Sequence, residues 1–526
     1  MKKIYTLFIS ICITAYSFAQ NVTITPSGIT PATGGIPKMT YDEIKAIASP
    51  ERGDLVIDTS YNTLRMWNGT EWTYFTSGLS KDNVLLTGYS VAGDSLEYVT
   101  SIDFDDSGNR YITGLFNGSA TFGSTTLNNP NGSLYTAYVA KQNADGEYLW
   151  VKTSTGTGGM IPIKIRLDNS GNIFLGGYST GANTLWDGGG SFVAQENDVN
   201  VIKLNNNGIP QWSRVLGGSE YDTFVAMDID LSGDLVITGT FDGTASFVGN
   251  QLISNGQGDI FVARISNSTG SVSYLKQLGG AGNDFARDIK VNSLGHYILA
   301  GSYGTVFNVG GFPLNSVTPG KDNFFITTLN PVTNIFLNVK SFGNDGGYQG
   351  FLEVDTQNNV YFSGVTDDSL KMSSSLYQIP SSYNKLSEDE AVFILKFDAS
   401  LNTQKLTYFQ GDDLYAGILK MSDSDELYAQ FTTGRYIIIG DGSYYDTHAA
   451  RSILCEIDPI NSILIWSDPI HGQASPLDLN LDHEGILWSA GIYGGDIRVG
   501  NTRILGVGDY YEDNNQIDGY IIKAVK

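Results

Sequence analysis

A chain of 526 residues with a formal net charge of −24 carries no clustered lysine or arginine that could follow a phosphate backbone, which excludes nucleic acid as its partner. The same acidity disfavours attraction to an anionic membrane surface. Its 62 glycines, 30 tyrosines and 25 phenylalanines accompany many short apolar runs, a composition that is typical of an all-β protein.

The first 19 residues predict a secretory signal peptide. Lys2 and Lys3 form its charged start, residues 7–15 form its apolar core, and residues 17–19 have the small-x-small pattern of a cleavage site. The apolar run is too short to cross a bilayer comfortably, so a signal peptide is favoured over a membrane anchor. We expect a mature chain that begins at Gln20, has no transmembrane segment, and is secreted or displayed on the outer cell surface.

The two cysteines cannot pair in this mature chain. Cys12 lies inside the predicted signal peptide, which leaves Cys455 without a partner for an intrachain disulfide. Burial of apolar side chains must therefore stabilise the fold.

Two segments are expected before the main part of the chain. Residues 20–37 are rich in threonine, proline, glycine and serine without periodicity, and they predict a linker. Residues 38–77 predict a small α+β module with a short helix at 40–47. Its three strands are expected at residues 54–58, 63–67 and 71–75. So small a sheet has little core of its own, so we expect it to pack on the rest of the chain or to form oligomers with another subunit.

The strands of this module carry a recognisable pattern. Its residues are Pro50, 53–56, 58–59, Leu64 and 67–72. The pattern resembles a module near the N-termini of secreted proteins of Bacteroidetes bacteria and in phage tail-fibre-like proteins. Trp67 and Trp72 could stack on a carbohydrate, but a role as the core of the small sheet is favoured.

From about residue 80 the sequence repeats itself seven times, with a period of 60 to 67 residues. Unit three, residues 217–280, shows four short apolar strands joined by glycine-rich turns. A turn between the first two strands marks the phase of each unit, at positions 108, 171, 233, 295, 358, 425 and 485. Six residues later the second strand ends in glycine in every unit except the sixth, which is the most divergent.

The repeats predict a closed ring of blades. Apolar residues occur on both faces of the strands, and blades packed face to face around an axis cover both faces. The seventh unit lacks a fourth strand, because the chain ends at Lys526 just after the third. Residues 83–89 form an orphan strand ahead of the first unit, and its pairing with unit seven would close the ring. An open solenoid with polar caps is the alternative, and the fitting orphan strand favours closure.

Units three and four carry the clearest family resemblance. The matching residues are 216–219, 225–226, 231–233 and 238–239 in unit three, and 278–286, 292–295 and 300–301 in unit four. They resemble the repeat family of seven-bladed β-propellers in bacterial secreted and surface proteins, over roughly residues 80–526. This resemblance implies a seven-bladed β-propeller of four-stranded blades in an extracellular setting, and it transfers no catalytic residues.

Two Asp-x-Asp-x-Ser-Gly turns supply the candidates for a metal site. These are Asp103, Asp105, Asp228 and Asp230. The turns resemble the start of a calcium loop, but glycine stands where an EF-hand places its bidentate glutamate. The favoured interpretation is that these side chains bond the local backbone of a β-turn. We therefore expect no cofactor, with calcium as the open alternative.

Catalytic signatures are missing from the sequence. The four histidines are His296, His448, His471 and His483, scattered over three units without HxH or HExxH spacing. There is no Gly-x-Ser-x-Gly elbow, and 55 acidic residues make any carboxylate pair uninformative. Trp150, Trp212 and Trp466 recur in fourth strands, where packing inside blades is favoured over a quinone site. We assign no catalytic residue and expect a protein that is not an enzyme.

The segments between second and third strands vary most and offer a recognition surface. They contain Tyr377, Tyr383, Tyr436, Tyr444, Tyr445, Tyr510 and Tyr511. Tyrosine-rich loops on a rigid scaffold suit protein or glycan ligands, although the segments are equally well interpreted as hairpins at the outer rim. The sequence thus predicts a non-enzymatic scaffold that binds protein or glycan through its loops. An extracellular enzyme that cleaves polysaccharide or ester at an acidic site in the channel mouth is the alternative.

Overall fold

The computed structural model describes most of the chain from residue 22 onwards. The described ranges are 22–25, 28–31, 36–40, 43–44, 46–58, 63–67, 72–75, 85–93, 96–129, 135–156, 158–180, 184–187, 191–192, 197–316, 323–344, 349–366, 369–372, 375–378, 389–412, 414–433, 436–439, 444–446, 450–458, 463–499, 502–504 and 517–525. Strands dominate these ranges, as the composition predicts.

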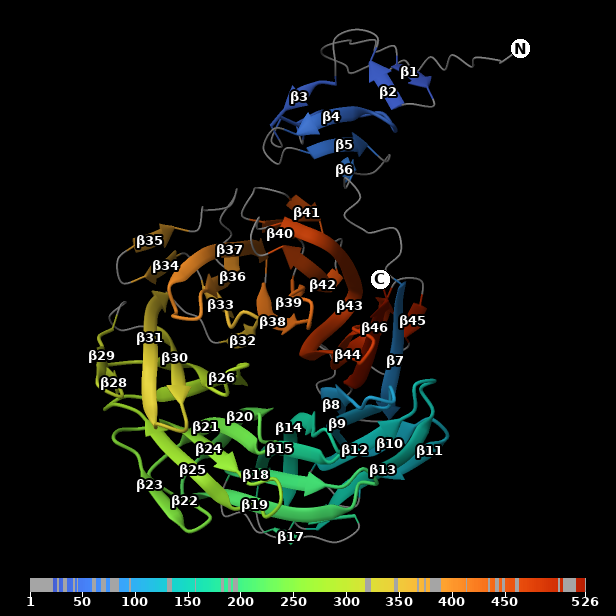
Figure 1. Ribbon diagram of the computed structural model, residues 1–526. Helices are drawn as coiled ribbons and strands as arrows, with labels where there is room; N and C mark the ends of the chain where they lie inside the picture. Colours follow the sequence, from blue (N-terminus) through green and yellow to red (C-terminus); the bar gives the residue numbers. More distant parts are fainter. Residues whose placement is uncertain are drawn as a thin grey trace.

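Seven four-stranded antiparallel blades surround a common axis, which confirms the predicted seven-bladed β-propeller (Figure 1). The first strand of each blade lies innermost, and the other three follow outwards. Blade 1 contains β8 (Leu96–Phe104), β9 (Arg110–Asn117), β12 (Thr136–Gln142) and β13 (Tyr148–Gly156). Blade 2 contains β14 (Gly159–Leu167), β15 (Ile173–Thr180), β18 (Asn197–Leu204) and β19 (Pro210–Gly218). Blade 3 contains β20 (Asp222–Ile229), β21 (Leu235–Phe241), β24 (Asp259–Ile265) and β25 (Val272–Leu278).

The next two blades repeat this arrangement, and the last two share a strand. Blade 4 contains β26 (Asp284–Val291), β27 (Tyr297–Tyr303), β30 (Asn323–Asn330) and β31 (Ile335–Asn344). Blade 5 contains β32 (Gly350–Val354), β33 (Val360–Thr366), β36 (Asp389–Phe397) and β37 (Thr403–Asp412). Blade 6 contains β38 (Tyr415–Met421), β39 (Leu427–Thr432), β42 (Ala450–Asp458) and the first half of β43 (Ile463–Leu481). Blade 7 contains the second half of β43, β44 (Leu487–Val499), β46 (Asp518–Val525) and β7 (Leu85–Gly93).

Blade 7 joins the two ends of the propeller, as the orphan strand predicts. β7 pairs antiparallel with β46, from Leu85 opposite Val525 to Val91 opposite Gly519. Arg110 of blade 1 reinforces the closure, because its guanidinium lies over the rings of both Tyr89 in β7 (5.2 Å) and Trp488 in β44 (4.6 Å). The ring is therefore closed by hydrogen bonds and packing rather than by a covalent connection.

The segments between second and third strands form hairpins at the outer rim. They are β10 (Ser119–Phe122) with β11 (Thr125–Asn128), β16 (Thr184–Trp186) with β17 (Ser191–Phe192), β22 (Thr244–Phe247) with β23 (Asn250–Ile253), β28 (Phe307–Val309) with β29 (Phe312–Leu314), β34 (Ser369–Met372) with β35 (Ser375–Gln378), β40 (Tyr436–Ile439) with β41 (Tyr444–Asp446), and the end of β44 with β45 (Thr502–Ile504). The hairpins β10, β16, β22, β34 and β40 pair with the outermost strand of the preceding blade. Their backbone groups therefore protect strand edges and join neighbouring blades.

The core is divided among the blade interfaces. One cluster of buried apolar side chains lies between each neighbouring pair of blades, seven in all within the described residues. Between blades 4 and 5, for example, Phe324 packs on Phe362 with ring centroids 5.2 Å apart. Because each blade is covered on both faces, its strands are apolar on both sides.

The N-terminal region contains two small sheets. β1 (Val22–Thr25) and β2 (Gly28–Pro31) form a hairpin. A second sheet has the order β3 (Lys38–Met39), β4 (Leu55–Asp58), β5 (Thr63–Trp67) and β6 (Trp72–Phe75). In the segment expected to be helical, Ile44 N donates to Thr40 O at 3.0 Å, and Glu43 Oε2 accepts from Thr40 N at 2.8 Å. The described residues of this segment thus make one capped turn, and the others lie outside the described ranges.

Candidate functional site

A β-bulge bends the innermost strand of most blades toward the axis. In blade 3 the register shifts between Phe224 and Ala226, opposite the glycine that ends the second strand, Gly239. A Cβ at Gly239 would overlap the carbonyl oxygen of Thr223, so only glycine permits this close approach. In blades 1, 2, 3, 4 and 7 the recurring glycine therefore lies opposite the bulge, and the residues after the bulge line the axis.

Seven residues of the innermost strands, one from each blade, occupy the same register, each opposite the second residue of the neighbouring strand. They are Asp103, Arg166, Asp228, Lys290, Glu353, Lys420 and Asn480, and are called here the axial ring. Neighbouring inner strands touch around the circle, including the last and the first. Negative and positive charges alternate from blade 1 to blade 6, so each carboxylate is flanked by hydrogen-bond donors.

Positive and negative charges cannot alternate completely around a ring of seven positions, because seven is odd. The position that interrupts the alternation is occupied by a neutral residue. Asn480 of blade 7 lies between the cationic Lys420 and the anionic Asp103. Its Nδ2 donates to Oδ1 of Asp103 and to the carbonyl oxygen of Ile102, both at 3.0 Å. Asn480 therefore donates a hydrogen bond to its acidic neighbour, Asp103, and provides no negative charge to compensate Lys420.

Ring carboxylates also connect neighbouring blades. Oδ2 of Asp103 accepts from Leu167 N of blade 2 at 2.8 Å, and Oδ2 of Asp228 accepts from Val291 N of blade 4 at 2.7 Å. These bonds occupy the carboxylates with backbone amides of the next blade. Asp103 and Asp228 are thus structural links as well as ring charges.

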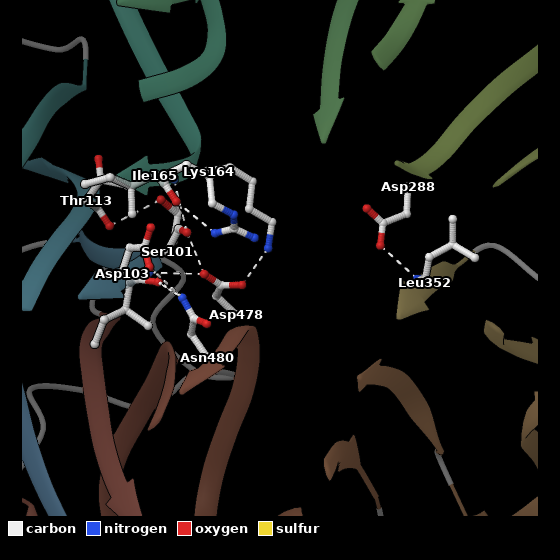
Figure 2. A network of polar contacts seen from close by, with 12 residues as sticks. Ser101, Asp103, Thr113, Lys164, Ile165, Asp288, Leu352, Asp478 and Asn480 are labelled. Carbon is white, nitrogen blue, oxygen red and sulfur yellow. Dashed lines mark hydrogen bonds and ion pairs between the residues drawn. The ribbon is translucent and has the colours of Figure 1, made fainter. Parts of the chain in front are cut away.

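A second layer of polar residues lies two positions before the ring (Figure 2). Asp478 accepts from Lys164 Nζ at 2.6 Å, from Ser101 Oγ at 2.5 Å and from Ile102 N at 3.1 Å, joining blades 7, 2 and 1. Burial raises the pKa of Asp478, but Lys164 and Arg166 outweigh burial and lower it to about 2. Across the axis in the same picture, Asp288 is separate and accepts from Leu352 N of blade 5 at 2.8 Å.

The ring cations differ in how well they are compensated. Burial lowers the pKa of Lys290, but Glu353 at 2.8 Å and Asp288 raise it well above its ordinary value. For Arg166 the surrounding carboxylates, Asp478 first, likewise outweigh burial and raise the pKa. The pKa of Lys420 is lowered instead, by burial and by the neighbouring cations Lys290 and Arg166, against the attraction of Glu353. Among the described residues no carboxylate lies within ion-pair distance of Lys420.

Lys420 also lines a pocket of about 760 Å³ between blades 6 and 7. Two turns form its rim, with residues 421–424 and 426 of blade 6 and residues 482–486 of blade 7. Elsewhere such turns are bridged, as where Thr356 N of blade 5 donates to Asp425 of blade 6 at 2.8 Å. Between blades 6 and 7 the pocket separates the two turns, and Leu481, Leu487 and Val525 are among its apolar lining residues.

The four aspartates considered as metal ligands are divided between two roles. Asp103 and Asp228 belong to the axial ring. Asp105 accepts from Ser107 N at 3.0 Å and Asn109 N at 2.9 Å within its turn, and Asp230 accepts from Ser232 N at 2.9 Å and Arg264 at 2.7 Å. Within the described ranges, no group of three or more His, Cys, Asp and Glu residues is placed to hold a metal ion.

The histidines and loop tyrosines do not converge on one place in the described part of the chain. His296 contacts Asn330 at 3.3 Å, and His483 lines the pocket between blades 6 and 7. His448, Tyr383, Tyr510 and Tyr511, and the side chains of His471, Tyr377, Tyr436, Tyr444 and Tyr445, lie outside what the structure describes.

The axial ring was not predicted from the sequence, although the sequence contains a signal for it. Every ring residue stands five positions before the phase marker of its unit, from Asp103 before 108 to Asn480 before 485. Reading that column across the seven units gives the alternating charges directly. The metal hypothesis took two of these residues singly and therefore missed the pattern.

No family model and no curated protein sequence matches this chain. Solved structures with some similarity include a Dyadobacter fermentans protein of unknown function, at 7% identity and a TM-score of 0.39, covering 84% of this chain and 99% of that one. A quinohemoprotein alcohol dehydrogenase from Comamonas testosteroni matches at 9% identity and 0.38, covering 84% and 76%. A polysaccharide lyase of family PL25, an ulvan lyase, matches at 12% and 0.34, covering 79% and 88%. All three TM-scores lie below 0.5, so the fold rests on the strand pairing above. Among the described residues no helix is long and apolar enough to span a bilayer.

Proposed function

We propose that this protein is a secreted or cell-surface scaffold that binds a protein or glycan ligand through its loops without chemical turnover. The observation that carries this proposal is the pocket of about 760 Å³ between the turns of blades 6 and 7. Its size is that of a small-ligand site, and its rim consists of loops held by rigid blades. A rigid propeller that holds loops in fixed positions is suited to binding a ligand through those loops.

Carboxylates near the axis support binding over catalysis. Asp103, Asp228, Asp288 and Asp478 each accept a backbone amide of the next blade. These bonds fix the four carboxylates as links between blades rather than directing them at a bound substrate. For Asp478 the neighbouring Lys164 and Arg166 also lower the pKa, which makes it a poor general base at neutral pH. The axis itself is mixed in charge rather than acidic.

An extracellular hydrolase or lyase is the second candidate, and the pocket rim favours it. Asp423, Asp482, Glu484 and His483 all line the pocket. Oδ1 of Asp482 already accepts from Glu484 N and Ile486 N, both at 3.0 Å, and Oδ2 accepts from Trp488 Nε1 at 2.9 Å. Both carboxylate oxygens of Asp482 therefore stabilise the turn at residues 482–486, which weakens the case for a catalytic carboxylate pair.

One experiment separates the two candidates. The chain from Gln20 is used as bait for proteins in native culture and on a glycan array, and the same preparation is incubated with acidic polysaccharides and ester substrates. Binding without product formation is expected, and Ser424→Trp, which fills the pocket from its exposed turn, is expected to reduce that binding. Product formation that His483→Ala abolishes would establish the enzyme instead.

The small N-terminal sheet supports a further part of the proposal. The Bacteroidetes-like and tail-fibre-like pattern in residues 38–77 suits a module that packs on another subunit. Comparing the molar mass of chains that begin at Gln20 and at residue 80 tests this part, because loss of an oligomer on truncation is expected.

A further inference from the structure

We propose that the pocket between blades 6 and 7 binds a saccharide that carries one anionic group, such as a uronic acid, with that group paired to Lys420. This inference rests on the proposed function and names the ligand class of the same site. It follows from the odd number of blades, from the position of Lys420 in both the ring and the pocket, and from the chemistry of the rim.

The charge at Lys420 is the one that the ring leaves uncompensated. On one side Glu353 already pairs with Lys290 at 2.8 Å, and on the other side stands neutral Asn480. A partly buried ammonium without a carboxylate partner favours an anion, because pairing replaces the hydration that burial removes. Lys420 also belongs to the pocket lining, so a ligand in the pocket would lie beside this residue.

The rest of the pocket selects against a polyanion. Asp423, Glu426, Asp482 and Glu484 line it, and the first and last of these are exposed at the rim. Together these carboxylates repel a ligand with many negative charges, and the exposed Asp423 and Glu484 can accept hydrogen bonds from hydroxyl groups. A ligand with one anion at its inner end and hydroxyl groups toward the rim therefore meets both requirements.

Size and apolar lining agree with a sugar ring. A volume of about 760 Å³ is in the range of pockets that hold small ligands. Leu481, Ile486 and Leu487 provide apolar contact for the C–H faces of a ring. An extended lipid or a flat aromatic ligand would leave the polar rim unpartnered.

Isothermal titration calorimetry of the chain from Gln20 tests the proposal with three monosaccharide probes. Glucuronic acid is expected to bind, and neutral glucose is expected to bind at least about ten-fold more weakly, because it lacks the charge-assisted bond. Glucose 6-sulfate distinguishes a carboxylate from another single anion, and binding of either anionic sugar over glucose supports the site.

Variants assign the binding to Lys420. Lys420→Met is expected to weaken glucuronic acid by about ten-fold or more, Lys420→Arg to retain most affinity, and Lys405→Met on β37 of blade 5 to have no effect. Ser424→Trp blocks the pocket from its exposed turn without altering the ring, so the test holds even if Lys420→Met fails to fold.

Two outcomes would overturn the inference. One is binding of glucose that equals the binding of both anionic sugars, and the other is unchanged glucuronic acid binding in a folded Lys420→Met variant or in Ser424→Trp. If no sugar acid binds while the glycan array or the culture bait still yields a ligand, the inference fails and the proposed function stands. If neither yields a ligand, both fail.

Discussion

The carboxylate of Asp478 connects three blades, because it accepts hydrogen bonds from Lys164, Ser101 and Ile102. Its folded pKa of about 2 lies below the ordinary value of 3.8, so its contribution to stability is present above about pH 4 and is lost as the pH falls toward 2. Asp478→Asn is expected to lower the free energy of unfolding by roughly 2 kcal/mol at pH 7. Urea unfolding between pH 2 and 7 should show a flatter profile for the variant.

Asp145→Asn is the matched control for that change, because Asp145 is an exposed turn residue. It should follow the wild-type profile within a few tenths of a kcal/mol. If Asp478→Asn and Asp145→Asn lose the same stability, the network around Asp478 does not stabilise the ring.

Asp284 behaves in the opposite way. Burial first, and then nearby Asp259, raise its pKa to about 6, although the hydrogen bond that Gly280 N donates to it at 2.6 Å lowers the pKa. A folded pKa above the unfolded one means that stability decreases as the pH rises from about 4 to about 6. Between pH 4 and pH 8, the free energy of unfolding of Asp284→Asn should therefore increase relative to that of the wild type by on the order of 1 kcal/mol or more. Thermal unfolding of both chains at the two pH values measures this, and a constant difference between them would refute it.

At the scale of single elements, β7 decides whether the ring is closed. It supplies the outermost strand of blade 7 and buries Leu86 and Val91 against neighbouring strands. Deleting Leu85–Gly93 exposes the edge of β46 and removes those contacts, so the midpoint of thermal unfolding should fall by roughly 10 °C or more. Calorimetry of the deletion against a chain that lacks only residues 20–37 provides the comparison. An unchanged midpoint would mean that closure contributes little.

The outer hairpins illustrate how an element can serve a different purpose from the one its composition suggests. Variable, glycine-rich and tyrosine-rich segments are typical of binding loops. In the propeller, β10, β16, β22, β34 and β40 extend the sheet of the preceding blade. Backbone pairing tolerates many side chains, which explains why these segments vary in sequence.

For the whole molecule, the number of blades sets the electrostatics of the axis. Six blades would allow charges to alternate completely, whereas seven force one neutral or mismatched position, occupied here by Asn480. Lys290 is compensated by Glu353 and Lys420 is not. Lys290→Met should cost about 2 kcal/mol, because it leaves Glu353 without its close partner, and Lys420→Met should cost less than about 1 kcal/mol. Urea midpoints of the two variants provide the measurement, and a larger loss for Lys420→Met would contradict the account of the ring.

Local chemistry in the sequence determined the fold. The phase markers, the glycine six positions later and the apolar strands recur within each unit, and each reflects a contact between residues close in the chain. Gly239, for example, is required by the bulge opposite Phe224. The incomplete seventh unit predicted the pairing of β7 with β46 by simple matching of a missing strand to a spare one.

Contacts between residues far apart in the chain were decided by the tertiary structure. Asp103 and Asn480 are 377 positions apart and share a hydrogen bond, because closing the ring brings the first and last blades together. No local pattern reports which turns meet and which stand apart, so the pocket beside Lys420 had no counterpart in the sequence. By itself the sequence determined the repeat and the blades, because those follow from local patterns, and it determined the closure, because counting strands left one spare and one missing. Only the folded ring decided which of these charges pair, because that depends on contacts between side chains of neighbouring blades, about 60 positions apart in the chain.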